Sequence, residues 1–253
     1  MFLCLIDYDE TLINDNNEIS NITKSLINDY INSNNKFCII STELYDNLKS
    51  FVNKYNLNID FASISSSSYF INNIEVINNI KKEFIIDLEN KFKDEIYTAY
   101  GYGLTNYIFK YQDRLKNMYP TNYNLKILND FNSYFLAINI DISKEIEDFI
   151  INNNYHFDLI GKDKNREFLL IKPIKFDKSD IYNLLINTYK NKKTIGIGNS
   201  YSDYDFIKYC DIKIAMKNSD LKLIESVNYV TDFDNNNDGA LLKLNDICHF
   251  KKV

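Results

Sequence analysis

Short apolar runs alternate along the chain with longer stretches in which apolar residues recur at helical spacing. The runs have the length and continuous apolarity of strands buried on both faces of a sheet, and they cover residues 3–6, 36–40, 61–64 and 194–197. Two of the intervening stretches match amphipathic helices, with apolar positions at Ile19, Ile22, Leu26, Ile27, Tyr30 and Ile31 and at Leu44, Leu48, Phe51, Val52 and Tyr55. This alternation predicts the α/β class, with a doubly wound parallel sheet.

The alternation changes at Ile80. A helix-like segment is followed by further strand-like and helix-like segments, at residues 80–92, 133–141, 142–150, 155–161 and 166–173. Such a mixture predicts an α+β domain inserted into the parallel sheet. We therefore expect a core of residues 1–79 and 176–253 and an inserted domain of residues 80–175.

Composition and charge narrow the class of protein. The 253 residues are 45% hydrophobic, which is enough to build a full core. A net charge of -6 argues against nucleic acid as the main partner, because phosphate backbones attract clustered Lys and Arg. The four cysteines form no CxxC pair and predict free thiols, and no apolar stretch approaches the roughly 20 residues that span a bilayer. We expect a cytoplasmic protein with no membrane partner.

The first apolar run ends in two carboxylates, Asp7 and Asp9. In parallel α/β sheets, ligands bind beyond the carboxyl ends of the strands, so a carboxylate there is well placed for chemistry. Aspartate is also a common turn former between a strand and a helix. On the residues alone, both interpretations stand.

The pattern DxDxT, formed by Asp7, Asp9 and Thr11, resembles the first motif of the haloacid dehalogenase superfamily of aspartate-nucleophile phosphatases. The resemblance implies that Asp7 attacks phosphorus and that Asp9 serves as general acid and base, because the leaving oxygen needs a proton from a second group. It also implies a parallel core sheet with an inserted cap domain. The residue before the threonine is usually glycine in this family, whereas this chain has Glu10.

Further motifs follow in the family's order. Two adjacent hydroxyl residues, Ser41 and Thr42, end the second strand-like run, where the resemblance implies a phosphate-binding hydroxyl. Related Cof-like sequences carry apolar residues seven, ten and eleven places beyond this hydroxyl, and from Ser41 these places are Leu48, Phe51 and Val52. The resemblance therefore favours Ser41, although a helix cap fits either residue. Lys178 matches the family's phosphate-binding lysine. The segment 198–203 resembles the motif GDxxND, with Asp203 retained and Asn199 where the family has aspartate.

The resemblance implies a Mg²⁺ cofactor held by Asp7, the backbone carbonyl of Asp9 and the side chain of Asn199. Asp203 would either orient Asn199 and Lys178 or act as a further ligand. An asparagine side chain offers a neutral oxygen, so the site loses one negative charge relative to the family. We therefore expect weaker metal binding.

The inserted segment resembles the larger, C2-type caps of Cof-like and mannosyl-3-phosphoglycerate phosphatases. Arg166 stands where the latter enzymes carry a Gly-Arg-Phe sequence, and it is either a contact to a substrate anion or a surface residue at a strand edge. The resemblance implies a magnesium-dependent phosphatase whose substrate is a small phosphorylated metabolite, of the sugar phosphate or glycosyl-phosphoglycerate type. The alternative is a phosphate-binding or regulatory protein of the same fold with weakened catalysis, which Glu10 and Asn199 motivate.

Overall fold

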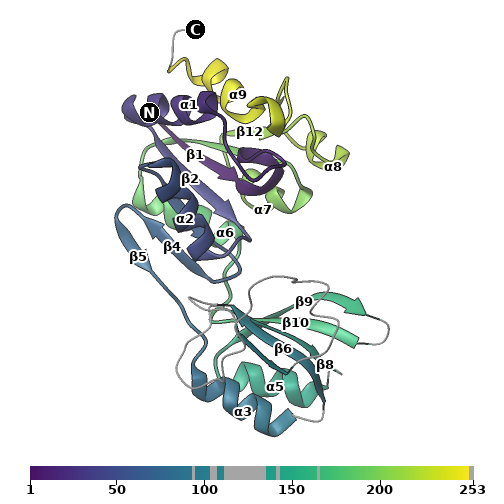
Figure 1. Ribbon diagram of the computed structural model, residues 1–253. Helices are drawn as coiled ribbons and strands as arrows, with labels where there is room; N and C mark the ends of the chain where they lie inside the picture. The colour runs from purple at the N-terminus through teal and green to yellow at the C-terminus, as the bar shows by residue number, and fades with distance from the viewer. Residues whose placement is uncertain (93–94, 103–106, 111–134, 141–142, 164–165, 251–253) are drawn as a thin grey trace. The chain divides into compact units, whose positions relative to one another are not determined.

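The computed structural model describes residues 1–92, 95–102, 107–110, 135–140, 143–163 and 166–250 (Figure 1). Two compact units divide the chain. The first contains Met1–Ile64, Tyr69–Glu75 and Phe176–Val253, and the second contains Ser65–Ser68 and Val76–Lys175. The segment 80–175, predicted to be the inserted domain, lies within the second unit.

An eight-stranded sheet forms the centre of the first unit, in the order β13-β12-β11-β1-β2-β3-β4-β5. The pairs from β13 to β3 are parallel. The strands are β1 (Phe2–Asp7), β2 (Lys36–Ser41), β3 (Asp60–Ser63), β4 (Ser68–Ile71), β5 (Ile74–Val76), β11 (Lys193–Gly198), β12 (Ile212–Ala215) and β13 (Tyr229–Val230). The predicted parallel α/β sheet is confirmed.

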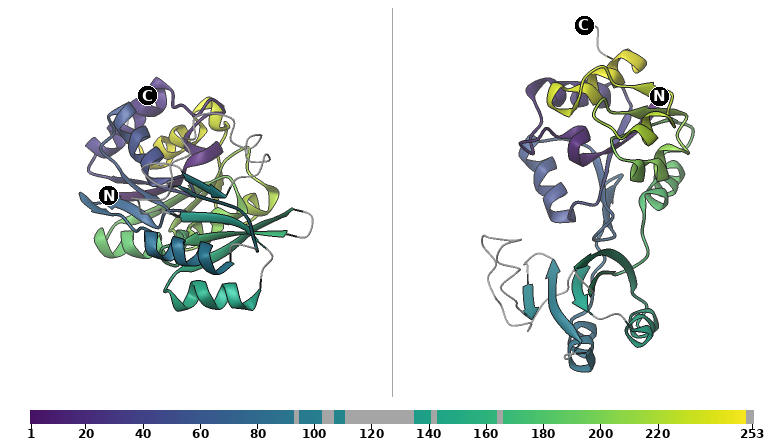
Figure 2. Two further views of the ribbon diagram at one scale, coloured as in Figure 1. Left: turned by 60° about the horizontal axis from the view of Figure 1, so that its bottom comes forward. Right: turned by 90° about the vertical axis from the view of Figure 1, so that its right-hand side faces the viewer.

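Helices cover both faces of this sheet because the side chains of each central strand alternate between them. Cys4 and Ile6 of β1 pack into one hydrophobic cluster, and Leu3 and Leu5 pack into the other. The first cluster takes residues from α1 (Asn21–Asn32), α2 (Tyr45–Tyr55) and α9 (Gly239–Cys248), and the second from α6 (Lys178–Thr188), α7 (Tyr204–Ile207) and α8 (Leu221–Ile224). Helices α1 and α9 contact each other and lie side by side in both figures (Figures 1 and 2).

Three short helical turns complete the first unit: η1 (Tyr8–Leu12), η2 (Tyr201–Asp203) and η3 (Asn235–Asn237). Turn η1 directly follows β1, and η2 follows β11 after a short loop. Both turns therefore lie where parallel strands end. Ser20 caps α1 as the sequence indicates, since its side chain accepts a hydrogen bond from the backbone N–H of Thr23 at 3.0 Å.

The second unit is built on an antiparallel sheet in the order β7-β6-β8-β10-β9. Its elements are α3 (Lys82–Phe92), β6 (Ile96–Tyr102), β7 (Tyr107–Lys110), β8 (Phe135–Ile140), α5 (Lys144–Asn152), β9 (His156–Asp163) and β10 (Arg166–Lys172). Helices α3 and α5 cover one face, where Phe84, Leu88, Ile146 and Ile150 pack with Leu169 of β10. The expected α+β character of this segment is confirmed.

Within the described residues, no helix combines the length and the apolarity needed to cross a membrane. All four cysteines are free; Cys4, Cys38 and Cys210 are buried and Cys248 is half-buried.

Candidate active site at the carboxyl ends of the central strands

Three neighbouring parallel strands bring the predicted residues to one edge of the sheet. Asp7 is the last residue of β1 and Ser41 is the last residue of β2, while Asn199 directly follows β11. Strand β1 lies between the other two, with Ile6 opposite Ile197 and Asp7 opposite Ile40. Because parallel strands end at the same edge, the strand order β11-β1-β2 places these side chains near one another.

Lys178 joins this edge as the first residue of α6. Its helix begins in a capping box, in which the Asp177 side chain accepts hydrogen bonds from the backbone N–H groups of Ser179 and Asp180. Lys178 Nζ lies 2.7 Å from Asp7 Oδ1 and also donates to Asp203 Oδ1. The side chains of these three residues are almost completely buried: Asp7 is 8% exposed, Lys178 9% and Asp203 1%. One buried ammonium therefore serves two buried carboxylates.

The Asp203 carboxylate is held on both oxygens. While Oδ1 accepts from Lys178, Oδ2 accepts from the backbone N–H groups of Asn199 and Ser200, each at 3.0 Å. This close approach requires glycine at position 198, since a Cβ there would lie 2.5 Å from Asp203 Oδ2. Both oxygens thus contact Lys178 and the loop that carries Asn199, as the orienting role would require, and the role of Asp203 as a metal ligand stays a prediction.

Excess negative charge and burial shift the pKa values of this cluster. Burial, reinforced by the Asp203 charge and opposed by Lys178, raises the pKa of Asp7 to about 7. Burial works to lower the pKa of Lys178, but the charges of Asp7 and Asp203 outweigh it and raise this pKa. Partial burial and the charge of Glu43 raise the pKa of Asp9 above its usual value. A raised pKa suits a carboxyl group that must both donate and accept a proton.

The turn after β1 has an unusual backbone at Glu10, where φ is 52°. This left-handed conformation favours glycine, and other residues adopt it when their surroundings impose it. Here the Asn218 side chain donates to the backbone carbonyl of Glu10 at 2.9 Å. The Glu10 side chain accepts a hydrogen bond from Asn199 Nδ2 at 3.1 Å. Thr11 Oγ1 donates to Asp7 Oδ2 at 3.3 Å and completes the turn.

The two hydroxyl candidates differ in environment. Ser41 is 1% exposed, and its Oγ accepts a hydrogen bond from the backbone N–H of Glu43 at 2.8 Å. Helix α2 begins later, with Leu44 in its cap position, so Ser41 is not the cap of that helix. Thr42 is exposed in the bend that follows β2.

Arg166 begins β10 in the second unit, opposite Asp163 of β9. Its side chain and the neighbouring Asn165 lie outside the described part of the molecule, so its role as a substrate contact stays a prediction. Sequence reasoning missed the contacts of Glu43 and Asn218. Asn218 could have been found, because it closely follows the carboxyl end of β12, another parallel strand of the same sheet.

The residues present fit a hard divalent cation. No three His, Cys, Asp or Glu side chains form a metal-binding group in the ranges that the structure describes. The predicted magnesium ligands do not require three carboxylates, because they include the backbone carbonyl of Asp9 and the side-chain oxygen of Asn199. Oxygen atoms of this kind are the ligands that Mg²⁺ prefers. Asp7 and Asn199 lie at the ends of adjacent strands, as such a site requires.

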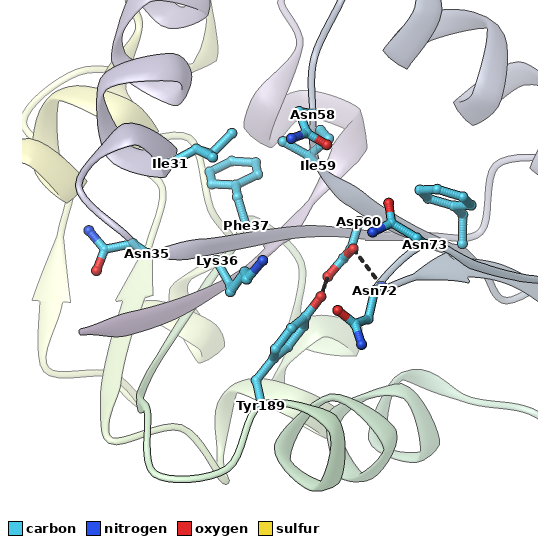
Figure 3. Close-up of a pocket in the computed structure, with 11 residues that line it drawn as sticks. Ile31, Asn35, Lys36, Phe37, Asn58, Ile59, Asp60, Asn72, Asn73 and Tyr189 are labelled. Atoms are coloured by element: carbon cyan, nitrogen blue, oxygen red, sulfur yellow. Dashed lines mark hydrogen bonds between the residues drawn. The ribbon is translucent and has the colours of Figure 1, made fainter.

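A cavity of about 120 Å³ lies at the opposite edge of the sheet, near the amino ends of β2 and β3 (Figure 3). Its central feature is Asp60, whose carboxylate accepts hydrogen bonds from the Tyr189 hydroxyl at 2.6 Å and from the backbone N–H of Asn72 at 3.0 Å. Burial raises the pKa of Asp60. Both carboxylate oxygens have protein partners, so this cluster joins three segments of the fold.

Fold and site together define a class of protein: α/β proteins with a parallel core sheet, an inserted α+β unit, and a carboxylate–lysine cluster at the ends of the central strands. The chain belongs to the haloacid dehalogenase-like hydrolase family, whose model matches residues 4–244. The recognition of this family from the sequence motifs is confirmed.

Solved structures share the whole fold at low sequence identity. TM0651 from Thermotoga maritima is 18% identical, with 97% of each chain covered and a TM-score of 0.75. A haloacid dehalogenase-like hydrolase from Bacteroides thetaiotaomicron is 18% identical, with 97% of this chain and 99% of that chain covered and a TM-score of 0.72. BT1666 of the same organism, studied among phosphatases of the superfamily, is 14% identical, with coverage of 99% and 95% and a TM-score of 0.68. No curated protein matches the chain.

Proposed function

We propose that the protein is a magnesium-dependent phosphatase that hydrolyses a small phosphorylated metabolite through an aspartyl-phosphate intermediate. The observation that carries the proposal is the buried cluster of Asp7, Lys178 and Asp203 at the carboxyl ends of the central strands. Family membership supports a hydrolase, and the similarity to BT1666, studied among phosphatases, supports phosphate esters as substrates.

The proposed reaction has two steps, and Asp7 and Asp9 take part in both. In the first, a carboxylate oxygen of Asp7 bonds to phosphorus while the bond to the leaving oxygen breaks, and Asp9 gives that oxygen a proton. In the second, water attacks the phosphoryl group, Asp9 takes a proton from the water, and the bond to Asp7 breaks. Phosphate leaves and both carboxyl groups return to their starting states. The shifted pKa of Asp9 favours this double use.

Lys178 and the hydroxyl residues bind the phosphoryl group. The Lys178 ammonium lies 2.7 Å from Asp7, where it offsets the charge brought together by nucleophile and phosphate. Ser41 and Thr42 are the hydroxyl donors at the end of β2. When bound, Mg²⁺ would further neutralise the phosphoryl oxygens, and its ligands would be Asp7, the Asp9 carbonyl and the Asn199 side chain. We expect substrates of the sugar phosphate or glycosyl-phosphoglycerate type, with Arg166 as a contact for their anionic groups.

One observation favours a second candidate, a phosphate-binding protein with weakened catalysis. The side chain at position 199 is a neutral amide that donates its hydrogen bond to Glu10. Retention of Asp7, Asp9 and Lys178 favours the phosphatase.

Phosphate release from a generic aryl phosphate in the presence of Mg²⁺ separates the two candidates. We expect turnover by the wild-type protein and none by Asp7→Asn, since the amide is not a nucleophile. Asp232→Asn is a matched control, because it removes a carboxylate that pairs with Lys243 at the surface, and it should retain full activity. A wild-type protein that binds phosphate but releases none from a panel of sugar phosphates would instead identify the binding protein.

A further inference from the structure

Glu10 and Asn199 form a side-chain pair that the proposed chemistry leaves unexplained. Asn199 Nδ2 donates to Glu10 Oε2 at 3.1 Å, across 189 positions of sequence. Glu10 belongs to the turn after β1 and Asn199 to the loop after β11, and these strands are adjacent. The pair therefore links the turn that carries the Asp9 carbonyl to the loop that carries Asn199, which are two of the three expected cation ligands.

Both backbones of the pair are fixed by other contacts. The Glu10 carbonyl accepts from Asn218 at 2.9 Å, and the residue keeps a left-handed φ of 52°. The backbone N–H of Asn199 donates to Asp203 at 3.0 Å, and its carbonyl accepts from the N–H of Asp220 at 3.1 Å. A non-glycine residue in the left-handed region carries strain that its surroundings must offset. The two backbones are therefore held in place by other contacts, and the side chains of Glu10 and Asn199 meet at the surface between them.

The chemistry of the pair fixes the orientation of the amide. A carboxylate only accepts hydrogen bonds, so it must face the NH₂ group of Asn199, which turns the Oδ1 atom of Asn199 away from Glu10. Oδ1 is the atom able to bind a cation, but it is neutral. The Glu10 carboxylate brings a full negative charge into direct contact with this neutral ligand.

We propose that Glu10 is a positioning residue for the divalent cation: it orients Asn199 Oδ1 and supplies the negative charge that Asn199 lacks. This inference rests on the proposed function, since it concerns the cation of that reaction. Groups that hydrogen-bond to a metal ligand typically change metal affinity by about 10- to 100-fold when they are removed. The weaker binding expected from Asn199 alone is thus offset by Glu10.

The test measures Mn²⁺ binding to the full chain by electron paramagnetic resonance, with no substrate present. Glu10→Gln keeps a hydrogen-bond acceptor but removes the charge, and we expect the Kd for Mn²⁺ to rise about tenfold. Glu18→Gln is the matched control. It removes the charge of another exposed glutamate, which pairs with Lys54, and it should leave the Kd unchanged. If Glu10→Gln fails to fold, Glu10→Gly carries the same expected loss on a backbone that suits glycine.

A charge swap provides the decisive comparison. In the double variant Glu10→Gln with Asn199→Asp, the carboxylate moves across the contact, so we expect the Kd to return to the wild-type value. An unchanged Kd in Glu10→Gln would overturn the inference. So would a double variant that binds Mn²⁺ as weakly as Glu10→Gln, because the Glu10 effect would then be independent of position 199.

These outcomes are distinct from those of the proposed function. Wild-type protein that hydrolyses an aryl phosphate, together with a Glu10→Gln variant of normal Mn²⁺ affinity, would overturn only the role of Glu10. Conversely, loss and rescue of Mn²⁺ binding in a protein without phosphatase activity would support the role of Glu10 and overturn the phosphatase.

Discussion

At the scale of single residues, the site is defined by an imbalance of charge. Two buried carboxylates, Asp7 and Asp203, share one ammonium, that of Lys178. Burying an ion is costly, and one partner cannot fully offset two opposite charges. The carboxylates differ because Asp203 also accepts two backbone hydrogen bonds, whereas the only other donor to Asp7 in the described ranges, besides Lys178, is a hydroxyl at 3.3 Å. The less stabilised carboxylate is therefore the one placed to react.

This imbalance predicts how stability depends on pH in the presence of a chelator. Because the pKa of Asp7 is raised to about 7, the folded state favours the protonated form of this carboxyl group. The resulting contribution to the free energy of unfolding is fully present below the ordinary pKa of aspartate and is lost as the pH rises through about 7. Asp7→Asn cannot ionise and avoids this loss. We expect the free energy of unfolding of Asp7→Asn to exceed that of the wild type at pH 8, by up to ~4 kcal/mol, and the excess to shrink toward pH 4.

Urea unfolding of both proteins at several pH values between 4 and 8, with EDTA present, measures this difference. Asp60 also has a raised pKa, but it is present in both proteins and its contribution cancels. Parallel pH profiles for the two proteins would contradict the assigned burial cost at Asp7.

At the scale of the elements, the two edges of the central sheet carry different groups of residues. The carboxyl ends of β11, β1 and β2 present Asn199, Asp7 and Ser41, while the amino ends of β2 and β3 enclose Asp60 and its partners (Figure 3). Tyr189, the C-cap residue that follows α6, donates to Asp60 at 2.6 Å. Helix α6 therefore places Lys178 at one edge through its first residue and anchors itself at the other through Tyr189.

A comparison of two buried tyrosines of this unit, Tyr189 and Tyr30, tests how much the hydrogen bond to Asp60 stabilises the fold. Tyr189→Phe removes the donor of a buried carboxylate, and we expect it to lower the free energy of unfolding by about 1–3 kcal/mol. Tyr30 is fully buried as well, but its hydroxyl has no hydrogen-bond partner among the described residues, so Tyr30→Phe should leave stability unchanged or raise it. Denaturant unfolding of the two variants checks the prediction; equal losses would show that the Asp60 contact adds nothing.

The elements also show which parts of the fold and of the site could be predicted from the local sequence pattern. Strand β1 could be predicted because Leu3 to Ile6 are all apolar, and their side chains are indeed fully buried on both faces. The gathering of Asp7, Ser41 and Asn199 at one edge followed from strand order. The Glu10–Asn199 contact could not be predicted, since it depends on a left-handed backbone and joins segments 189 positions apart. The same holds for Asp60, whose partners Asn72 and Tyr189 come from segments with no motif of their own.

At the scale of the whole molecule, the residues proposed for phosphoryl transfer and Arg166, the proposed substrate contact, belong to different units. The residues proposed for phosphoryl transfer all belong to the first unit, and the motifs that revealed them lie there too. The second unit interrupts that core and carries Arg166 on an antiparallel sheet. The family model spans both units, since it matches residues 4–244. Our proposal leaves the choice of metabolite to residues of the second unit.

The central claim is that Asp7 is the nucleophile, and the most direct measurement is acid quenching of the wild-type protein during turnover of a radiolabelled aryl phosphate, followed by peptide mapping. We expect the labelled phosphoryl group on the peptide that contains Asp7, in a linkage that hydroxylamine cleaves, and no label on Asp7→Asn. Label on a different residue, or phosphate release that persists in Asp7→Asn, would contradict it.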